Sequence, residues 1–160
     1  MNIAIVGATG NVGRKTLEVL EKKELSIDNL YLLASSKSAG KKISFKDKEH
    51  EVFDLENFDF SKVKIAFFAA GGKISEKFAE KAAKHCLVID NSSFYRMDPD
   101  VPLIVPQVNS NHLDQIKKNI IANPNCSTAQ LVIALKPLHD LFVIKRIVVS
   151  TYQSVSGGGK

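Results

Sequence analysis

The chain opens with Asn2-Ile3-Ala4-Ile5-Val6-Gly7-Ala8-Thr9-Gly10-Asn11-Val12-Gly13, the strongest indication of its fold. Residues 2–6 form an apolar run typical of a buried strand, and helical periodicity follows from about residue 11 to residue 23. Glycines between a first strand and a first helix permit a tight turn, and the helix N-terminus offers free amides to a pyrophosphate. The loop that contains Gly7, Gly10 and Gly13 therefore predicts a dinucleotide-binding site. The alternative is a plain glycine turn between strand and helix, which would have the same sequence pattern.

The alternation of strand and helix patterns continues along the chain. Apolar runs predict buried strands at residues 31–34, 65–70, 87–89 and 120–122, with a hairpin around residues 43–52. Helical spacing of apolar residues recurs at 74–82 and 131–138. Because parallel strands need crossover connections, we expect an α/β, Rossmann-like fold, a mostly parallel sheet with helices on both faces.

The last part of the chain has a different character. Residues 144–152 have the β-branched density of a strand, and Ser156-Gly157-Gly158-Gly159-Lys160 follow as a glycine turn. Such a turn normally introduces a further element. We therefore expect the sequence to be a fragment of a longer protein.

Composition narrows the possible functions. The 160 residues are 44% hydrophobic and 24% charged, which is typical of an ordinary globular domain. The net charge of +5 comes from scattered lysines without interleaved aromatic residues, so we expect no nucleic-acid partner. No apolar run is long enough for a membrane span, and no targeting segment follows Met1, so we expect a cytoplasmic protein.

The loop after the strand at 31–34 bears on the choice of cofactor. It reads Ser35-Ser36-Lys37-Ser38-Ala39-Gly40-Lys41, with no carboxylate before Asp47. A carboxylate there would hold the ribose 2′-hydroxyl of NAD, whereas hydroxyls and a cation suit the 2′-phosphate of NADP. We expect NADP, with Ser36, Lys37 and Ser38 near the phosphate; a flexible polar loop is the alternative. Gly71 ends the strand at 65–70, where it either approaches the cofactor or serves only as a helix-entry turn.

The two cysteines have different settings. Neither a disulfide framework nor the paired spacing of a zinc site is present, so we expect free thiols and no metal. Cys126 falls at the start of the helix around 131–138, where terminal amides favour the reactive thiolate. A thiolate beside a nicotinamide suggests hydride transfer through a thioester. Cys86 fits a buried small hydrophobe, and none of the four histidines supplies a convincing base.

Several motifs together resemble the aspartate-semialdehyde dehydrogenases. They are the loops at 7–13 and 35–41, Asp90-Asn91-Ser92-Ser93, residues 101–106, Asn123-Pro124-Asn125-Cys126-Ser127-Thr128, and Ser150-Thr151-Tyr152-Gln153. The resemblance spans the whole chain. It implies a cofactor domain at residues 1–125 and, at 126–160, the beginning of a truncated second α+β domain for catalysis and dimerisation, with 144–152 as its first strand.

The resemblance also assigns roles to residues. It implies Cys126 as the acyl-thioester nucleophile, Gln153 as a substrate-orienting residue, and Arg96, with Asn125, as the phosphate-binding group. The remaining implied NADP contacts are Thr9, Gly10, Asn11, Val12, Lys37, Ser38, Ser156 and Gly157. Taken alone, Arg96 is equally well explained by a surface ion pair with Asp98 or Asp100. Lys37 stands where the family usually has arginine, Gln107 where it has glutamate, and Gly158 where it has alanine.

The implied activity is the NADPH-dependent reduction of L-aspartyl 4-phosphate to L-aspartate 4-semialdehyde, in the biosynthesis of lysine, diaminopimelate, threonine and methionine. The family's chains are about twice as long and form homodimers or tetramers, so we expect this chain to be inactive alone. Two alternatives stay open. One is an N-acetylglutamyl-phosphate reductase-like enzyme, and the other is a dinucleotide-binding module without catalysis.

Overall fold

A computed structural model describes residues 1–23 and 25–155. Ser156 and Gly157, which we expect to contact the cofactor, lie outside these residues. Within the described part, no helix is both long and apolar enough to cross a membrane.

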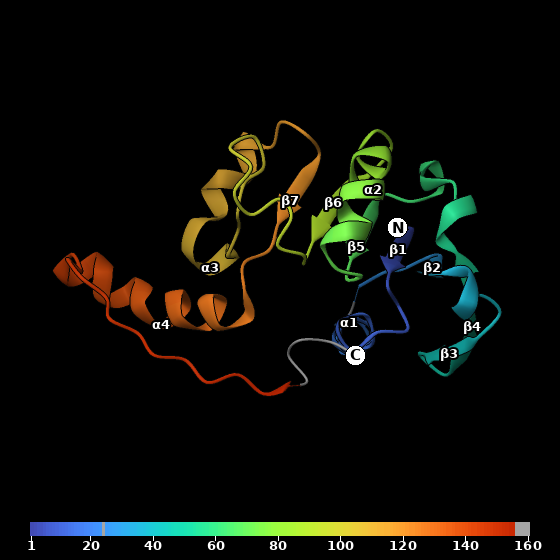
Figure 1. The fold of residues 1–160 in the computed structure, drawn as a ribbon, viewed down its shortest axis with the longest axis horizontal. Helices are drawn as coiled ribbons and strands as arrows, with labels where there is room; N and C mark the ends of the chain where they lie inside the picture. Colours follow the sequence, from blue (N-terminus) through green and yellow to red (C-terminus); the bar gives the residue numbers. More distant parts are fainter. Residues whose placement is uncertain (24, 156–160) are drawn as a thin grey trace.

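One seven-stranded sheet organises the molecule, in the order β3-β4-β2-β1-β5-β6-β7 (Figure 1). The strands are β1 (Ile3–Val6), β2 (Leu30–Ala34), β3 (Lys42–Phe45), β4 (Lys48–Asp54), β5 (Ile65–Phe68), β6 (Leu87–Asp90) and β7 (Ile120–Ala122). All neighbours pair in parallel except β3 and β4, which form the expected antiparallel hairpin. The predicted Rossmann-like sheet is thus confirmed.

Helices cover both faces of this sheet. The α-helices of the described residues are α1 (Asn11–Glu21), α2 (Gly72–Ala83), the short α3 (Pro106–Asn109) and α4 (Cys126–Phe142), with 3-10 turns at Ser36–Ser38, Leu55–Asn57, Phe60–Lys62 and Ser110–Gln115, and α1 and α2 cover the two faces of the sheet. Leu17 and Leu20 of α1 belong to the core on one face, while Phe78 of α2 belongs to the core on the other. Side chains alternate between the two faces along each strand, so β1 supplies both cores.

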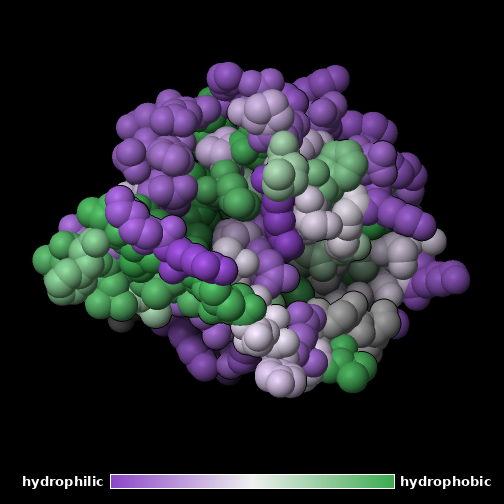
Figure 2. Space-filling view, turned by 60° about the vertical axis from the view of Figure 1, so that its left-hand side comes forward, coloured by the Kyte–Doolittle hydropathy of each residue, from purple (hydrophilic) through white to green (hydrophobic). Residues whose placement is uncertain are grey.

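Helix α4 lies apart from the sheet, and its apolar residues are poorly covered (Figure 1). Among the described residues it has no buried member, and Leu141 and Phe142 are about three-quarters exposed, at 74% and 76%. Figure 2 shows hydrophobic residues gathered on the side of the molecule that α4 occupies. Contact with water is unfavourable for so much exposed apolar surface.

The strand expected at residues 144–152 is not formed. After α4 the chain turns back and runs toward α1 without pairing to any strand in the described part of the chain (Figure 1). The sequence has strand propensity here, but a strand also needs a neighbour to take up its backbone hydrogen-bonding groups. Propensity alone therefore gave a wrong prediction at this point.

Candidate active site

The glycine loop after β1 is packed too closely for side chains. Gly7 has φ +85°, and a Cβ on it would lie 2.9 Å from the backbone carbon of Ala69. A Cβ on Gly13 would lie 2.2 Å from the carbonyl oxygen of Gly7. Gly10 caps α1 without a side-chain hydrogen bond, so amides of the first turn remain available to a ligand.

This loop lies where the strand order of the sheet reverses. From β1 the chain moves to β2 on one side and later to β5 on the other side of β1. In open α/β sheets the crevice outside the carboxyl ends of the strands at such a point is the usual ligand site. Gly71, at the same edge after β5, has φ +85° and no atom within 4 Å of a Cβ position, so it leaves open space there.

The loop that follows β2 reaches the same edge of the sheet. Ser36–Ser38 form a single 3-10 turn, closed by a hydrogen bond of 2.8 Å from the amide of Ser38 to the carbonyl of Ser35. Ser36 and Lys37 are exposed to solvent. Because β2 pairs directly with β1, the hydroxyls of Ser36 and Ser38 and the ammonium group of Lys37 follow the strand next to the glycine loop.

Cys126 is the first residue of α4, as the sequence predicted. The preceding Asn125 caps the helix: its Oδ1 accepts hydrogen bonds from the Ser127 amide at 3.0 Å and the Ser127 hydroxyl at 2.7 Å. The Cys126 sulfur lies 3.8 Å from the same Oδ1 and is exposed. A helix N-terminus and solvent access are the surroundings in which cysteine thiolates react.

Cys86 is the opposite case. It is only 4% exposed, and its thiol donates to the Ala82 carbonyl at 3.3 Å. Burial raises the pKa of the Cys86 thiol to about 11. The prediction of a buried cysteine at this position is confirmed.

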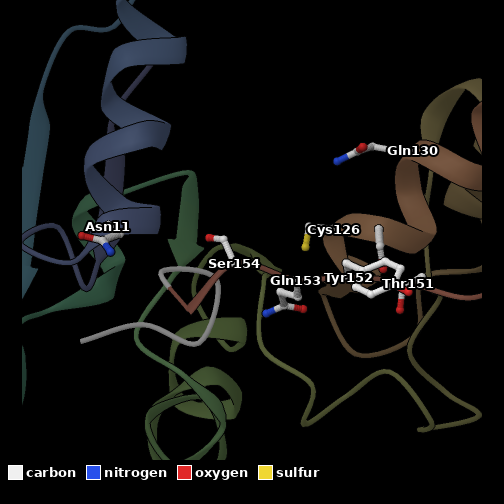
Figure 3. Close-up of a pocket in the computed structure, with 8 residues that line it drawn as sticks. Asn11, Cys126, Gln130, Thr151, Tyr152, Gln153 and Ser154 are labelled. Atoms are coloured by element: carbon white, nitrogen blue, oxygen red, sulfur yellow. The ribbon is translucent and has the colours of Figure 1, made fainter.

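A cavity of about 420 Å³ joins the helix starts of α1 and α4. Its lining residues are Asn11, Cys126, Ser127, Gln130, Thr151, Tyr152, Gln153 and Ser154. In Figure 3, Asn11 lies at the start of α1, Cys126 at the start of α4, and Gln153 and Ser154 between them. The structure therefore brings one expected cofactor-binding residue, the expected nucleophile and the expected orienting residue to a single cavity.

Gln130 is a lining residue to which the sequence analysis gave no role. It follows Cys126 by one helical turn, so both side chains lie on one face of α4. Figure 3 shows both at the cavity. The spacing of four residues from Cys126 was the sequence feature that could have indicated Gln130 as a site residue. Asn125 and Arg96 are not among the residues that line this cavity.

Arg96 has other partners than the sequence suggested. Its Nε donates to the Asn123 carbonyl at 2.9 Å and its Nη2 to the Asn91 carbonyl at 3.0 Å. The expected acidic partners are taken by lysines, since Asp98 pairs with Lys118 and Asp100 with Lys117. The alternative of a surface ion pair at Arg96 is wrong, because the guanidinium is held between the carboxyl ends of β6 and β7.

No histidine of the described residues lines the cavity that contains Cys126. His50 contacts the Phe45 ring in the hairpin, and His112 is hydrogen-bonded to Asn109. His139 lies further along α4 and lines a separate cavity of about 370 Å³. The part of the chain described here therefore brings no histidine to the thiol to act as a base.

A glycine loop at the switch point of a parallel sheet, followed by a helix with open N-terminal amides, defines a dinucleotide-binding α/β domain. Residues 2–116 match the family described as semialdehyde dehydrogenase, NAD binding domain, and the chain belongs to this family. Its members bind a nicotinamide dinucleotide through this domain, in agreement with the loop geometry.

Relatives and solved structures agree with this membership. An aspartate-semialdehyde dehydrogenase of Legionella pneumophila is 55% identical over all of this chain and 47% of its own length. The crystal structure of aspartate semialdehyde dehydrogenase II of Vibrio cholerae, complexed with ASA, is 52% identical with a TM-score of 0.96, over 99% of this chain and 48% of that one. The resemblance drawn from the motifs is confirmed.

A more distant structure carries a cofactor. Aspartate semialdehyde dehydrogenase of Candida albicans, determined with NADP, is 33% identical with a TM-score of 0.71, over 89% of this chain and 48% of that chain. The chain described here thus spans about half the length of the relatives it matches.

Proposed function

We propose that this chain is the cofactor domain, with the nucleophilic cysteine, of an aspartate-semialdehyde dehydrogenase that reduces L-aspartyl 4-phosphate with NADPH. The observation that carries the proposal is the cavity shared by Asn11 and Cys126. A thiol on the same cavity as the dinucleotide loop suits acyl chemistry coupled to hydride transfer. The similarity to enzymes of this name favours it over the N-acetylglutamyl-phosphate reductase and over a non-catalytic module.

Cys126 carries the acyl group in this proposal. Its thiolate attacks the carbonyl carbon of the acyl phosphate, an S–C bond forms, and the C–O bond to phosphate breaks as phosphate leaves with the electron pair. The partial positive charge at the start of α4 stabilises the oxyanion of that step. Gln153 orients the acyl group from across the cavity, and Arg96 and Asn125 bind the phosphate. When bound, NADPH supplies the hydride that reduces the acyl group.

The cofactor site in the proposal consists of two loops. Gly7 and Gly13 leave a surface without side chains, on which a pyrophosphate fits against the start of α1; Thr9, Gly10, Asn11 and Val12 contribute contacts there, and Gly71 leaves room after β5. Ser36, Lys37 and Ser38 hold the 2′-phosphate, which favours NADP over NAD. The NADP-bound relative supports this preference.

We divide the chain at residue 125, with α4 and the segment after it beginning the catalytic domain. The support is that α4 carries exposed apolar side chains, among them Leu138, Leu141 and Phe142, and has no buried residue in the described part of the chain. The relatives are about twice as long as this chain, and we propose that their additional half covers α4. The whole protein is proposed to be a cytoplasmic homodimer or tetramer of the amino-acid biosynthetic pathways named above, on the family resemblance.

Calorimetric titration of the chain with NADPH and with NADH tests the cofactor site. We expect NADPH to bind more tightly, and Lys37→Glu to remove that preference because a carboxylate repels the 2′-phosphate. Lys41→Glu makes the same charge change at an exposed position beyond the 3-10 turn and serves as the control. Tighter binding of NADH, or an unchanged preference in Lys37→Glu, would overturn this assignment.

A further inference from the structure

A buried carboxylate ends strand β6. Asp90 is fully buried, at 0% exposure, and in the described part of the chain its carboxylate accepts hydrogen bonds from hydroxyl and amide groups. Its Oδ1 accepts from the Ser75 hydroxyl at 2.7 Å and the Ser92 amide at 3.0 Å, and its Oδ2 accepts from the Ser92 hydroxyl at 2.7 Å. Burying a carboxylate is costly even when it is hydrogen-bonded, and an apolar residue would fill the same space at lower cost.

The two bonds to Ser92 fix the turn that follows β6. The Ser92 hydroxyl also accepts from the Phe94 amide at 3.1 Å, so residues 90–94 are tied into one compact turn. Asn91 lies inside this turn, between the carboxylate and its partner, and its carbonyl is one of the two that hold Arg96.

The second carbonyl that holds Arg96 is also linked to Asp90. The Asn123 carbonyl accepts from Arg96 Nε, and the Asn123 amide donates to the Asp90 carbonyl at 2.8 Å. Asn91 and Asn123 are joined by a side-chain hydrogen bond as well. Both acceptors of the guanidinium thus belong to residues that Asp90 neighbours or binds.

We infer that Asp90 is a positioning residue for Arg96. It acts through the Ser92 turn, which sets the direction of the Asn91 carbonyl and so the plane of the guanidinium. Guanidinium carries five N–H groups in a fixed fork. With Nε and one Nη2 hydrogen directed at backbone carbonyls, the outer edge of the fork is presented to an anion. That the anion is phosphate rests on the proposed function; the positioning does not.

A substitution at Ser75 can distinguish a positioning role of Asp90 from a purely structural role in the buried core. Ser75 is fully buried, lies in α2, and donates to the same Oδ1, but within the described part of the chain it makes no hydrogen bond to Ser92, Phe94 or Arg96. Ser75→Ala and Ser92→Ala each remove a buried hydroxyl from the Asp90 carboxylate. If Asp90 only stabilises the fold, the two variants should behave alike.

The arginine side-chain Nε–H signals of the ¹⁵N-labelled chain provide the readout. The sequence contains Arg14, Arg96 and Arg146, so Arg96→Lys assigns the signal and the other two serve as internal references. We expect hydrogen exchange at Arg96 Nε to be about tenfold slower than at the references, as a charged hydrogen bond implies. Ser92→Ala and Asp90→Asn should lose that protection, while Ser75→Ala keeps it even though its melting temperature falls.

Titration with inorganic phosphate then separates the two proposals. We expect phosphate to shift the Arg96 Nε–H signal, with about tenfold weaker affinity in Ser92→Ala because the fork is misdirected. If the Arg96 Nε–H signal is protected in an Asp90-dependent way but does not shift with phosphate, the phosphate-binding role of Arg96 is refuted and its positioning by Asp90 is supported. Unchanged protection in Ser92→Ala, or equal loss in Ser75→Ala, would overturn the positioning. Ser92→Ala decides the matter if Asp90→Asn does not fold.

Discussion

Asn11 and Cys126, the first residues of α1 and α4, line one cavity of about 420 Å³. The N-terminal caps of the two helices differ. The cap of α1 is Gly10, with no side-chain bond, whereas Asn125 caps α4 through the Ser127 amide. Open amides suit a phosphate ligand at α1. At α4 the cap fixes the turn that carries the thiol.

The glycine loop gives a sharp pair of variants. Gly13→Ala places a Cβ 2.2 Å from the Gly7 carbonyl oxygen, while Gly10→Ala places it 3.4 Å from the same atom. We expect Gly13→Ala to lower the free energy of unfolding by about 2 kcal/mol or more and to abolish dinucleotide binding. Gly10→Ala should keep the fold. Urea unfolding and calorimetry measure both effects, and a Gly13→Ala chain with wild-type stability would refute the packing described.

The buried thiol predicts a pH dependence of stability. Since burial raises the pKa of Cys86 to about 11, the folded state favours the neutral thiol more than the unfolded state does. The resulting contribution to the free energy of unfolding is fully present below the ordinary thiol pKa of about 8.5. It is lost as the pH rises toward 11, by about 1 kcal/mol per pH unit. Urea unfolding of wild type and Cys86→Ala across this range isolates it. A difference in the free energy of unfolding between wild type and Cys86→Ala that does not change with pH would contradict the burial of the Cys86 thiol.

Tyr95 offers a stabilising substitution. Its hydroxyl is buried and has no hydrogen-bond partner among the described residues, and burial raises the pKa of Tyr95 to about 12. An unpaired buried hydroxyl costs about 1–3 kcal/mol. Tyr95→Phe should therefore raise the free energy of unfolding by about 1 kcal/mol, whereas Tyr152→Phe, at a fully exposed ring, should leave it unchanged. A loss of stability in Tyr95→Phe would mean that the hydroxyl is satisfied.

Local patterns were sufficient for most of the fold. The run at residues 2–6, the glycines after it and the helical spacing predicted β1 and α1, because these depend on neighbours close in sequence. The alternation of strand and helix patterns predicted the parallel sheet, because parallel strands need crossover connections. The position of Cys126 at the start of α4 followed from the apolar helical spacing at residues 131–138 in the same way.

Features that depend on distant contacts were not predicted. Residues 144–152 have strand propensity, but pairing requires a neighbouring strand, which the described part of the chain does not provide. Arg96 is followed by two aspartates, yet its partners are carbonyls at the ends of β6 and β7, brought together only by the sheet. The buried pair Ser75 and Asp90 likewise joins α2 to β6.

The isolated chain should show no phosphate-dependent oxidation of aspartate semialdehyde. In the described residues no histidine lines the cavity with Cys126, and loss of a general base typically costs about 10²-fold or more in rate. The absorbance of NADPH, followed with about micromolar protein, would detect a typical turnover of about 10 s⁻¹. Robust turnover would mean that His50, His85, His112 or His139 acts as the base.

Alkylation of the two cysteines tests the central claim, that Cys126 is the nucleophile at the cofactor cavity. At about pH 8 a thiol with a pKa of about 11 is only about one thousandth thiolate. Mass spectrometry of the iodoacetamide-treated chain should therefore show Cys126 reacting about 10²-fold faster than Cys86, and saturating NADP⁺ should slow Cys126 alone. Equal rates at the two thiols, or a Cys126 rate that bound NADP⁺ leaves unchanged, would contradict the account.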